Sequence, residues 1–278
     1  MKSLFDDLSA QCSQRTTKLY STSFYMGIQA LDQSLHRPIH GIYGLVRFAD
    51  EIVDSFHGYD KKELLQKFRS DTFEAIANRI SLNPILNEFQ KVVNDYRIDH
   101  SLIETFFESM EMDLEDKFHT VLSYKNYILG SAEVVGLMCL KVFVEGDQHK
   151  YNDLKPYAMS LGSAFQKVNF LRDIKADYET LGRTYFPNVD MTRFNQEDKR
   201  EIEADISADF EHALIGIKRL PRSSRNGVYL AYIYYLQLFR KIKDTPAEKI
   251  MKTRIRIPNL SKLGLMFQTI VQHKLNLI

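Results

Sequence analysis

Four aspartates are spaced so that they could bind a divalent cation. Asp50 and Asp54 stand four residues apart, and so do Asp173 and Asp177. Residues four apart on a helix share a face, so each pair would present two carboxylates to one side. Both pairs lie among apolar residues, and four carboxylates that face one cavity repel each other unless cations join them.

The neighbouring polar residues indicate what else would bind. Arg47 lies one turn before the first pair, Arg172 directly precedes the second, and Gln166 and Asn169 extend its row of polar side chains. Oxygen ligands without His or Cys suit a hard ion such as Mg²⁺, which keeps open positions for phosphate oxygens. Arginines make bidentate contacts to phosphate. The natural inference is a diphosphate held by Mg²⁺ between the two pairs.

The simpler alternative is a solvated helix face. Two acidic residues four apart on a helix usually do no more than face the solvent, and we interpret Glu104–Glu108 and Glu111–Glu115 in that way. The aspartate pairs differ in their apolar flanks and in their companion amides and arginines. Spacing alone leaves both interpretations open.

Helices must position these residues. The second pair is predicted on a helix from about Asp153 to about Leu181, which Gly182 caps and Pro187 ends. The first pair is predicted on a helix with Pro38 in its first turn, running to about Phe56.

The remaining sequence is also helical in pattern, without strand alternation or repeats. It predicts a single all-α domain over residues 1–278, with roughly ten or more helices. An irregular stretch is predicted at 188–196. The other predicted helices are Ser3–Lys18, Ser21–Ile28, Asp60–Ile80, Pro84–Tyr96, one that Asp99 caps, Tyr124–Val144, Glu197–Leu220, Asn226–Asp244 and Leu260–Leu275.

Composition excludes several classes of protein. The net charge of +1 carries no signature of nucleic-acid binding. Cys12 and Cys139 give neither a disulfide framework nor metal-ligand spacing, which favours a cytoplasmic protein. The N-terminus lacks the pattern of a signal peptide. The longest apolar runs, Val134–Leu140 and Gly227–Phe239, fall short of the roughly 20 residues that span a bilayer.

Six segments resemble motifs of the phytoene synthase/squalene synthase family, in order and over nearly the whole chain. The two longest are Y-G-L-V-R-F-A-D-E-I-V-D from Tyr43 and Q-K-V-N-F-L-R-D-I-K-A-D-Y-E-T-L-G-R-T-Y-F-P from Gln166. The shorter ones are S-T-S-F-Y from Ser21, Y-I-L-G-S-A-E-V-V-G-L-M from Tyr127, Y-L-Q-L-F-R-K-I from Tyr235 and R-I-R-I-P-N-L-S-K-L from Arg254.

The resemblance implies an isoprenoid-synthase-type helical bundle around a central cavity, in which two prenyl diphosphates are joined head to head. It implies Mg²⁺, or Mn²⁺ in its place, bound by Asp50, Asp54, Asn169, Asp173 and Asp177, with Tyr235 grouped with the aspartates as catalytic. The residues implied to bind substrate are Tyr20, Ser21, Phe24, Tyr43, Arg47, Tyr127, Gln166, Asn169, Arg172, Tyr185 and Lys262.

The segment G-R-T-Y-F-P is most similar to the bacterial phytoene synthase form of the motif. This favours condensation of two geranylgeranyl diphosphates to phytoene through a cyclopropylcarbinyl diphosphate, the first step of carotenoid biosynthesis, without NADPH. Farnesyl diphosphate going to squalene or dehydrosqualene is the alternative. A non-catalytic assembly or lipid-binding relative is a further one, and the intact aspartate pairs favour an enzyme over it.

The chain departs from the family pattern at three positions. Glu133 stands where a glycine is usual, Leu129 replaces a tyrosine, and Tyr20 occupies a position that is often His. From Arg240 onward the chain has nine Lys/Arg and two Asp/Glu. This excess indicates either a solvated basic rim beside an anionic site or peripheral attachment to the inner face of a membrane.

Overall fold

A computed structural model describes residues 1–115, 119–176, 178, 184–187 and 189–255. These residues form helices and no strand, so the predicted all-α class is confirmed. The α-helices are α1 (Lys2–Tyr20), α2 (Thr22–Gln29), α3 (Gln33–Ser55), α4 (Lys61–Asn78), α5 (Pro84–Tyr96), α6 (His100–Glu115), α7 (Val121–Ile128), α8 (Val134–Phe143), α9 (Gln148–Ala176), α10 (Gln196–Arg219), α11 (Arg222–Lys243) and α12 (Ala247–Ile250). Two short helices of other types are η1 (Leu129–Glu133, π) and η3 (Met191–Arg193, 3₁₀).

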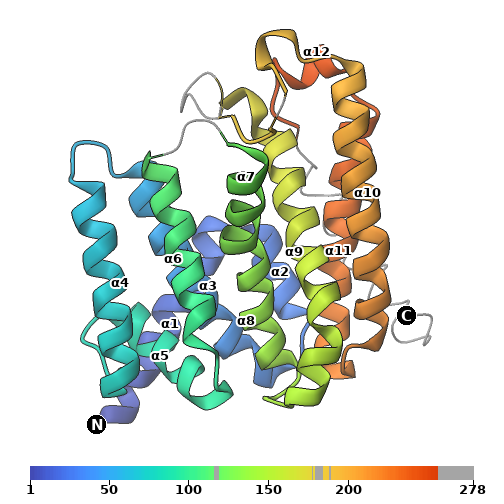
Figure 1. Ribbon diagram of the computed structural model, residues 1–278. Helices are drawn as coiled ribbons and strands as arrows, with labels where there is room; N and C mark the ends of the chain where they lie inside the picture. The colour runs from blue at the N-terminus through green and yellow to red at the C-terminus, as the bar shows by residue number, and fades with distance from the viewer. Residues whose placement is uncertain (116–118, 177, 179–183, 188, 256–278) are drawn as a thin grey trace.

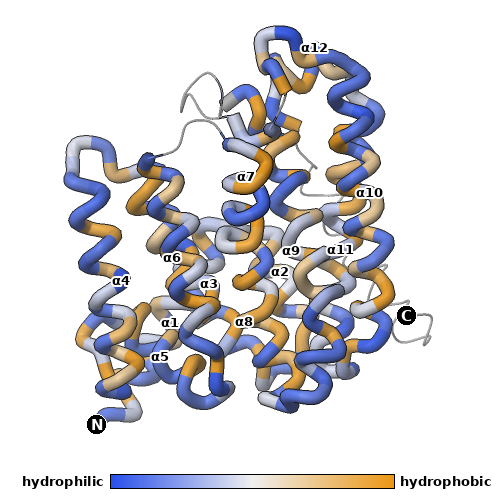
Figure 2. Tube along the Cα trace, viewed as in Figure 1, coloured by the Kyte–Doolittle hydropathy of each residue, from blue (hydrophilic) through white to orange (hydrophobic). Residues whose placement is uncertain are grey.

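The long helices run up and down a single bundle. The C-terminal ends of α3, α6, α9 and α11 all lie at its upper end in Figure 1, where α12 also lies. Helix α9 lies in the middle and packs against α8, α10 and α11. Hydrophilic residues predominate on the outer sides of α4 and α10, whereas α8 in the centre is largely apolar (Figure 2).

The apolar core divides into two large clusters and a small one. The first includes Leu45, Phe89 and Phe107 from α3, α5 and α6, and the second includes Val168 and Phe210 from α9 and α10. Each of these side chains is almost completely buried. The two clusters fix α3 and α9, the helices that carry the aspartate motifs, on opposite sides of the central space.

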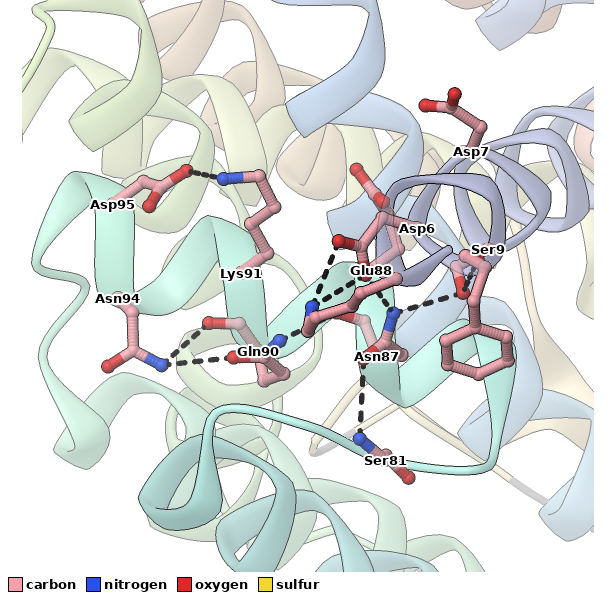
Figure 3. A network of polar contacts seen from close by, with 12 residues as sticks. Asp6, Asp7, Ser9, Ser81, Asn87, Glu88, Gln90, Lys91, Asn94 and Asp95 are labelled. Atoms are coloured by element: carbon pink, nitrogen blue, oxygen red, sulfur yellow. Dashed lines mark hydrogen bonds and ion pairs between the residues drawn. The ribbon is translucent and has the colours of Figure 1, made fainter.

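A polar network joins α1 to the rest of the bundle (Figure 3). Asn87 on α5 donates hydrogen bonds to Oδ1 of Asp6 and Oγ of Ser9 on α1, both at 3.1 Å. The buried carboxylate of Glu88 accepts from Arg37 on α3 at 2.8 Å. Because buried polar groups are costly without partners, these contacts define how α1 lies against α3 and α5.

The helix that carries the first aspartate pair begins earlier than the sequence predicts. Asp32 accepts a hydrogen bond from the Ser34 N–H at 3.0 Å and caps α3, so Pro38 lies inside the helix and not in its first turn. A proline there removes one backbone hydrogen bond, and the tightly buried surroundings of α3 offset that loss. Similarly, α9 begins at Gln148 and not near Asp153.

The chain from Val121 to Phe143 forms one continuous helical rod through α7, η1 and α8. The uninterrupted apolar runs of the sequence predicted no segment long enough to span a membrane. By length and composition alone this rod is long and apolar enough to do so. In the structure 56% of its most apolar window is buried inside the bundle. A Cβ on Gly130 would lie 2.5 Å from the Thr105 carbonyl oxygen, so this glycine lets the rod approach α6 closely. The predicted helix Leu260–Leu275 lies outside the described residues.

Candidate active site

A cavity of about 750 Å³ lies between α2, α3, α8, α9, α10 and α11. Its interior is lined mainly by apolar side chains such as Ile39, Val135, Leu161 and Leu230. Its polar residues gather where α3, α6 and α9 end, and we call this end the mouth. The charged residues of the mouth are Arg47, Asp50, Asp54, Asp113, Arg172, Asp173 and Arg254.

Every predicted site residue within the described part of the chain lines this cavity. These residues are Tyr20, Ser21, Phe24, Tyr43, Arg47, Asp50, Asp54, Tyr127, Gln166, Asn169, Arg172, Asp173, Tyr185 and Tyr235. Asp177 and Lys262 lie outside the described residues. Residues more than 200 positions apart in the sequence are therefore brought to one cavity by the packing of α1, α2, α3, α9 and α11.

The first aspartate motif is held by an arginine. Arg47 donates one hydrogen bond to Asp50 and another to Glu51, and its guanidinium lies 4.4 Å from the centre of the Tyr20 ring. Burial alone would lower the pKa of Arg47, but the two carboxylates outweigh it and the pKa is raised. Arg47 is thus a fixed positive charge at the mouth.

The second aspartate motif is held in the same way, from two directions. Nε of Arg172 lies 3.0 Å from Oδ2 of Asp173, and Nε of Arg254 lies 2.6 Å from Oδ1 of the same carboxylate. Burial acts to lower the pKa of Arg172, but its hydrogen bond and charge interaction with Asp173 raise it instead. Each motif therefore combines carboxylates that could hold cations with arginines that could hold phosphate.

Asp50, Asp54 and Asp173 line one cavity, and arginines engage the carboxylates of Asp50 and Asp173. In the described part of the chain, no three Asp, Glu, His or Cys side chains come close enough to hold a metal ion. The donor set at the mouth consists of carboxylate and amide oxygens, which fits a hard divalent cation and not a soft one. Metal binding by Asp50, Asp54, Asn169, Asp173 and Asp177 remains a prediction.

Aromatic rings stack in pairs along the cavity wall. The rings of Phe165 and Tyr235 lie 3.9 Å apart between centroids, and those of Phe24 and Tyr43 lie 5.0 Å apart. The Tyr235 hydroxyl donates to Oδ1 of Asn169 at 3.3 Å, which orients both side chains. Burial raises the pKa of Tyr43 to about 12, so its hydroxyl stays neutral at physiological pH.

Two charged residues of the mouth, Asp113 and Arg254, were not among the predicted site residues. Asp113 accepts hydrogen bonds from the hydroxyls of Tyr127 at 2.8 Å and Tyr185 at 3.3 Å, and burial raises the pKa of Tyr127 well above its usual value. Asp113 stands between Glu111 and Glu115, the pair that we interpreted as a solvated face. Asp113 is two residues from each of them, so it lies on the opposite side of α6. This spacing was the signal in the sequence that could have identified it as a site residue.

Glu133, one of the positions at which the chain differs from the family pattern, lies just outside the cavity wall. A Cβ on Gly162 would come within 3.0 Å of the Glu133 Cα, so α9 packs directly on η1 at this point. Burial raises the pKa of Glu133 to about 7, and nearby Asp209 adds to the effect while Lys167 opposes it. Lys167 is itself paired with Asp209 at 2.8 Å. Glu133 thus belongs to a partly buried polar group beside the cavity.

Comparison with known proteins agrees with this geometry. The model of the squalene/phytoene synthase family matches residues 17–261. The chain belongs to the squalene/phytoene synthase family. The 15-cis-phytoene synthase of Synechococcus elongatus is 24% identical over 282 aligned residues, which cover 91% of this chain and 89% of that protein. The 4,4'-diapophytoene synthase of Staphylococcus haemolyticus is 26% identical over 205 residues, covering 72% and 69%.

The fold is also that of known family members. A crystal structure of a dehydrosqualene synthase in complex with ligand superposes with a TM-score of 0.82 at 19% identity, covering 97% of this chain and 98% of that one. The predicted isoprenoid-synthase-type bundle is therefore confirmed. Family membership makes the chain a prenyltransferase, and the family's reaction is the head-to-head condensation of two prenyl diphosphates.

Proposed function

We propose that this prenyltransferase condenses two molecules of geranylgeranyl diphosphate to phytoene. The observation that carries the proposal is one cavity with a charged mouth and an apolar interior, which suits a diphosphate group attached to a long hydrocarbon tail. Two further observations support the choice of substrate. The segment from Gly182 to Pro187 has the phytoene synthase form, and the cyanobacterial phytoene synthase aligns over most of both chains.

The mouth would bind and orient the two diphosphates. Arg47, Arg172 and Arg254 already lie there as cations, and each could exchange its carboxylate partner for phosphate oxygens. The carboxylates released in this way, Asp50 and Asp173, would hold Mg²⁺ together with Asp54, Asn169 and Asp177. When bound, Mg²⁺ would supply positive charge that stabilises the departing diphosphate.

The reaction then proceeds in two ionisations. Loss of diphosphate from the first substrate gives an allylic cation, and the double bond of the second substrate captures it. Loss of a proton yields a cyclopropylcarbinyl diphosphate. Its ionisation, rearrangement and loss of a second proton give phytoene, so the overall products are phytoene, two diphosphates and two protons. No reductant is consumed.

The walls of the cavity would protect the cations. The stacked rings of Phe165 and Tyr235 and of Phe24 and Tyr43 line the cavity, and aromatic faces attract cations. The apolar residues that surround them exclude water, which would otherwise capture the cation as an alcohol.

A second candidate is the conversion of two farnesyl diphosphates to dehydrosqualene. The similarity to the diapophytoene synthase of Staphylococcus haemolyticus and to the dehydrosqualene synthase structure supports it. Both candidates use the same mouth and differ in the length of tail that the cavity accepts.

One incubation separates the candidates. The purified chain is supplied with Mg²⁺ and either geranylgeranyl or farnesyl diphosphate, with and without NADPH, and the hydrocarbon is identified by gas chromatography and mass spectrometry. We expect phytoene from geranylgeranyl diphosphate without NADPH. A higher kcat/KM with farnesyl diphosphate would favour the second candidate, and no hydrocarbon under any condition would overturn both.

A further inference from the structure

The end of the cavity opposite the mouth, which we call the closed end, has no role in the reaction as proposed. Helix α9 ends at the mouth and begins at the lower end of the bundle in Figure 1, where α8 ends. Leu154 is the first residue of α9 that lines the cavity, and further lining residues follow along the helix up to Asp173 at the mouth. One helix therefore follows the cavity over its whole depth.

The lining residues of α9 form one continuous face of the helix. From the closed end toward the mouth they include Leu154, Ala158, Leu161, Phe165 and Asn169. Steps of three and four residues keep these side chains on one side, so each residue marks a greater height above the closed end. The face is apolar from Leu154 to Phe165 and polar at Asn169, where the proposed diphosphate site begins.

The depth of this apolar part can be compared with the length of a prenyl tail. Asn169 and Leu154 are 15 residues apart, which corresponds to about 22 Å along the helix axis. Each isoprene unit adds a zigzag of carbon–carbon bonds of about 1.5 Å, so an extended geranylgeranyl tail spans roughly 20 Å and a farnesyl tail roughly 15 Å. The depth to Leu154 matches the longer tail and would leave the space of one isoprene unit beyond the shorter one.

A small core cluster backs the closed end. Its buried members come from the last part of α8 and its end, the first part of α9 and the end of α10, and they are Leu137, Leu140, Val144, Tyr151, Leu154 and Leu220. Leu140, Leu154 and Leu220 also line the cavity. Leu154 is only 4% exposed. Because protein interiors are close-packed, a tail that reached past Leu154 would have to displace this cluster.

We infer that Leu154 sets the longest prenyl tail that the enzyme accepts, because it ends the cavity about one geranylgeranyl length below the diphosphate site. The choice of prenyl diphosphates as ligands rests on the proposed function, whereas the closed end is a property of the cavity itself. Leu154 is thus a specificity-determining residue, far from the reacting atoms.

Three variants test the role of Leu154. Leu154→Ala removes the side chain that ends the cavity and should deepen it. Ala158→Leu adds a larger side chain about one helical turn nearer the mouth and should make the cavity shallower. Leu137→Ala is the matched control, since Leu137 belongs to the same cluster and is 2% exposed but does not line the cavity. Both leucine variants lose a similar amount of core packing, and circular dichroism checks that every variant is folded.

The preference for tail length is measured in two ways. Isothermal titration calorimetry in the presence of Mg²⁺ gives the Kd of thiolodiphosphate analogues with farnesyl, geranylgeranyl and geranylfarnesyl tails. Their bridging sulfur slows ionisation, so binding is measured without turnover. Parallel incubations with the three natural diphosphates give kcat/KM, and mass spectrometry identifies any hydrocarbon.

We expect the unchanged chain to bind the geranylgeranyl analogue roughly tenfold more tightly than either of the others. The farnesyl tail buries less apolar surface, and the last unit of the geranylfarnesyl tail finds no room. Leu154→Ala should bind the geranylfarnesyl analogue roughly tenfold more tightly than the unchanged chain does. Ala158→Leu should lose roughly tenfold for the geranylgeranyl analogue and keep its affinity for the farnesyl one. Leu137→Ala should keep the order of the unchanged chain.

The inference is overturned if Leu154→Ala has the same length preference as Leu137→Ala, or if the unchanged chain binds the three analogues equally well. If Leu154→Ala does not fold, an unaltered preference in Ala158→Leu overturns it instead. Absence of any hydrocarbon from the unchanged chain would refute the proposed function, while the binding series would still decide the role of Leu154. A preference for farnesyl diphosphate that Leu154→Ala shifts to a longer tail would correct the proposed substrate and support the role of Leu154.

Discussion

Nε of Arg254 lies 2.6 Å from Oδ1 of Asp173, so the segment after α12 reaches the second aspartate motif at the mouth. The Arg254 side chain is half exposed. Ion pairs of this kind contribute only about 0 to 1 kcal/mol to stability, so this contact has little value for folding. Its position beside Arg172 points to a role with the anionic substrate.

We therefore predict that Arg254→Gln weakens substrate binding more than it weakens the fold. The KM for the prenyl diphosphate should rise by about tenfold, because one charge-assisted contact to phosphate is lost. The free energy of unfolding in urea should change by less than about 1 kcal/mol. Lys252→Gln, two residues away and also exposed, serves as the control and should leave KM unchanged. An Arg254→Gln enzyme with normal KM would remove this residue from the diphosphate site.

The aspartate motifs lead to a second prediction. Asp50→Asn and Asp173→Asn should each lower kcat by about 100-fold or more, since on the proposed mechanism each removes a negative charge that would hold Mg²⁺ near the leaving diphosphate. The Mg²⁺ concentration for half-maximal activity should rise in parallel, which a structural defect would not cause.

Glu108→Gln is the matched control for the aspartate variants. Glu108 forms an i, i+4 pair with Glu104 on α6, but it is exposed and does not line the cavity. Its replacement should change neither kcat nor the Mg²⁺ requirement. If Asp50→Asn kept full turnover, the assignment of the first motif to metal binding would be wrong.

Much of this site could be predicted because its motifs are local. The spacing of Asp50 from Asp54 and of Asn169 from Asp173 defines a helix face without knowledge of packing. Caps such as Asp60 before α4 and Asn83 with Pro84 at the start of α5 are also local, and both helix starts were predicted correctly. The cavity itself followed only from the family resemblance.

The features that escaped prediction depend on neighbours in space. Asp113 acquires its role from Tyr127 and Tyr185, which reach it from other parts of the chain. The early start of α3 depends on packing that tolerates Pro38 inside the helix, and such packing is invisible in the local pattern. Short α12 is fixed by contacts of Ala247 and Ile250 with the core.

Two cavity glycines give a third prediction, on stability. A Cβ added to Gly227 on α11 would lie 2.4 Å from the Leu31 side chain and 2.6 Å from the Gly27 carbonyl oxygen. Because the carbonyl cannot move without shifting α2, Gly227→Ala should lower the free energy of unfolding by about 1 to 3 kcal/mol.

Gly27→Ala is the comparison, since its added Cβ would meet only the Gly227 carbonyl oxygen at an ordinary 3.8 Å. Alanine is the better helix former, so this variant should be neutral or stabilised by up to about 1 kcal/mol. Urea unfolding of both variants measures the difference. Equal stability of the two would show that α2 and α11 are not in close contact there.

The partly buried carboxyl of Glu133 gives the last prediction, on pH. Burial is the main reason why its pKa is raised to about 7 in the folded protein, from the ordinary value of 4.5 expected in the unfolded chain. The folded state therefore binds this proton more tightly than the unfolded state between those two values. The stability that Glu133 contributes is fully present below pH 4.5 and is lost as the pH rises toward 7. The shift by itself corresponds to about 3 kcal/mol. Because the side chain is only partly buried, solvent screening reduces the loss to roughly 1 to 3 kcal/mol.

Glu133→Gln isolates this contribution, because glutamine keeps the shape and cannot ionise. The variant should be more stable than the unchanged chain above pH 7, and the difference should shrink steadily toward pH 4.5. Buried His40, whose pKa is lowered to about 4 by burial, has the opposite dependence, but both proteins contain it and it cancels in the difference. Urea unfolding across this pH range measures the curve. A difference that does not vary with pH would mean that Glu133 is ionised in the folded protein, paired with Lys167.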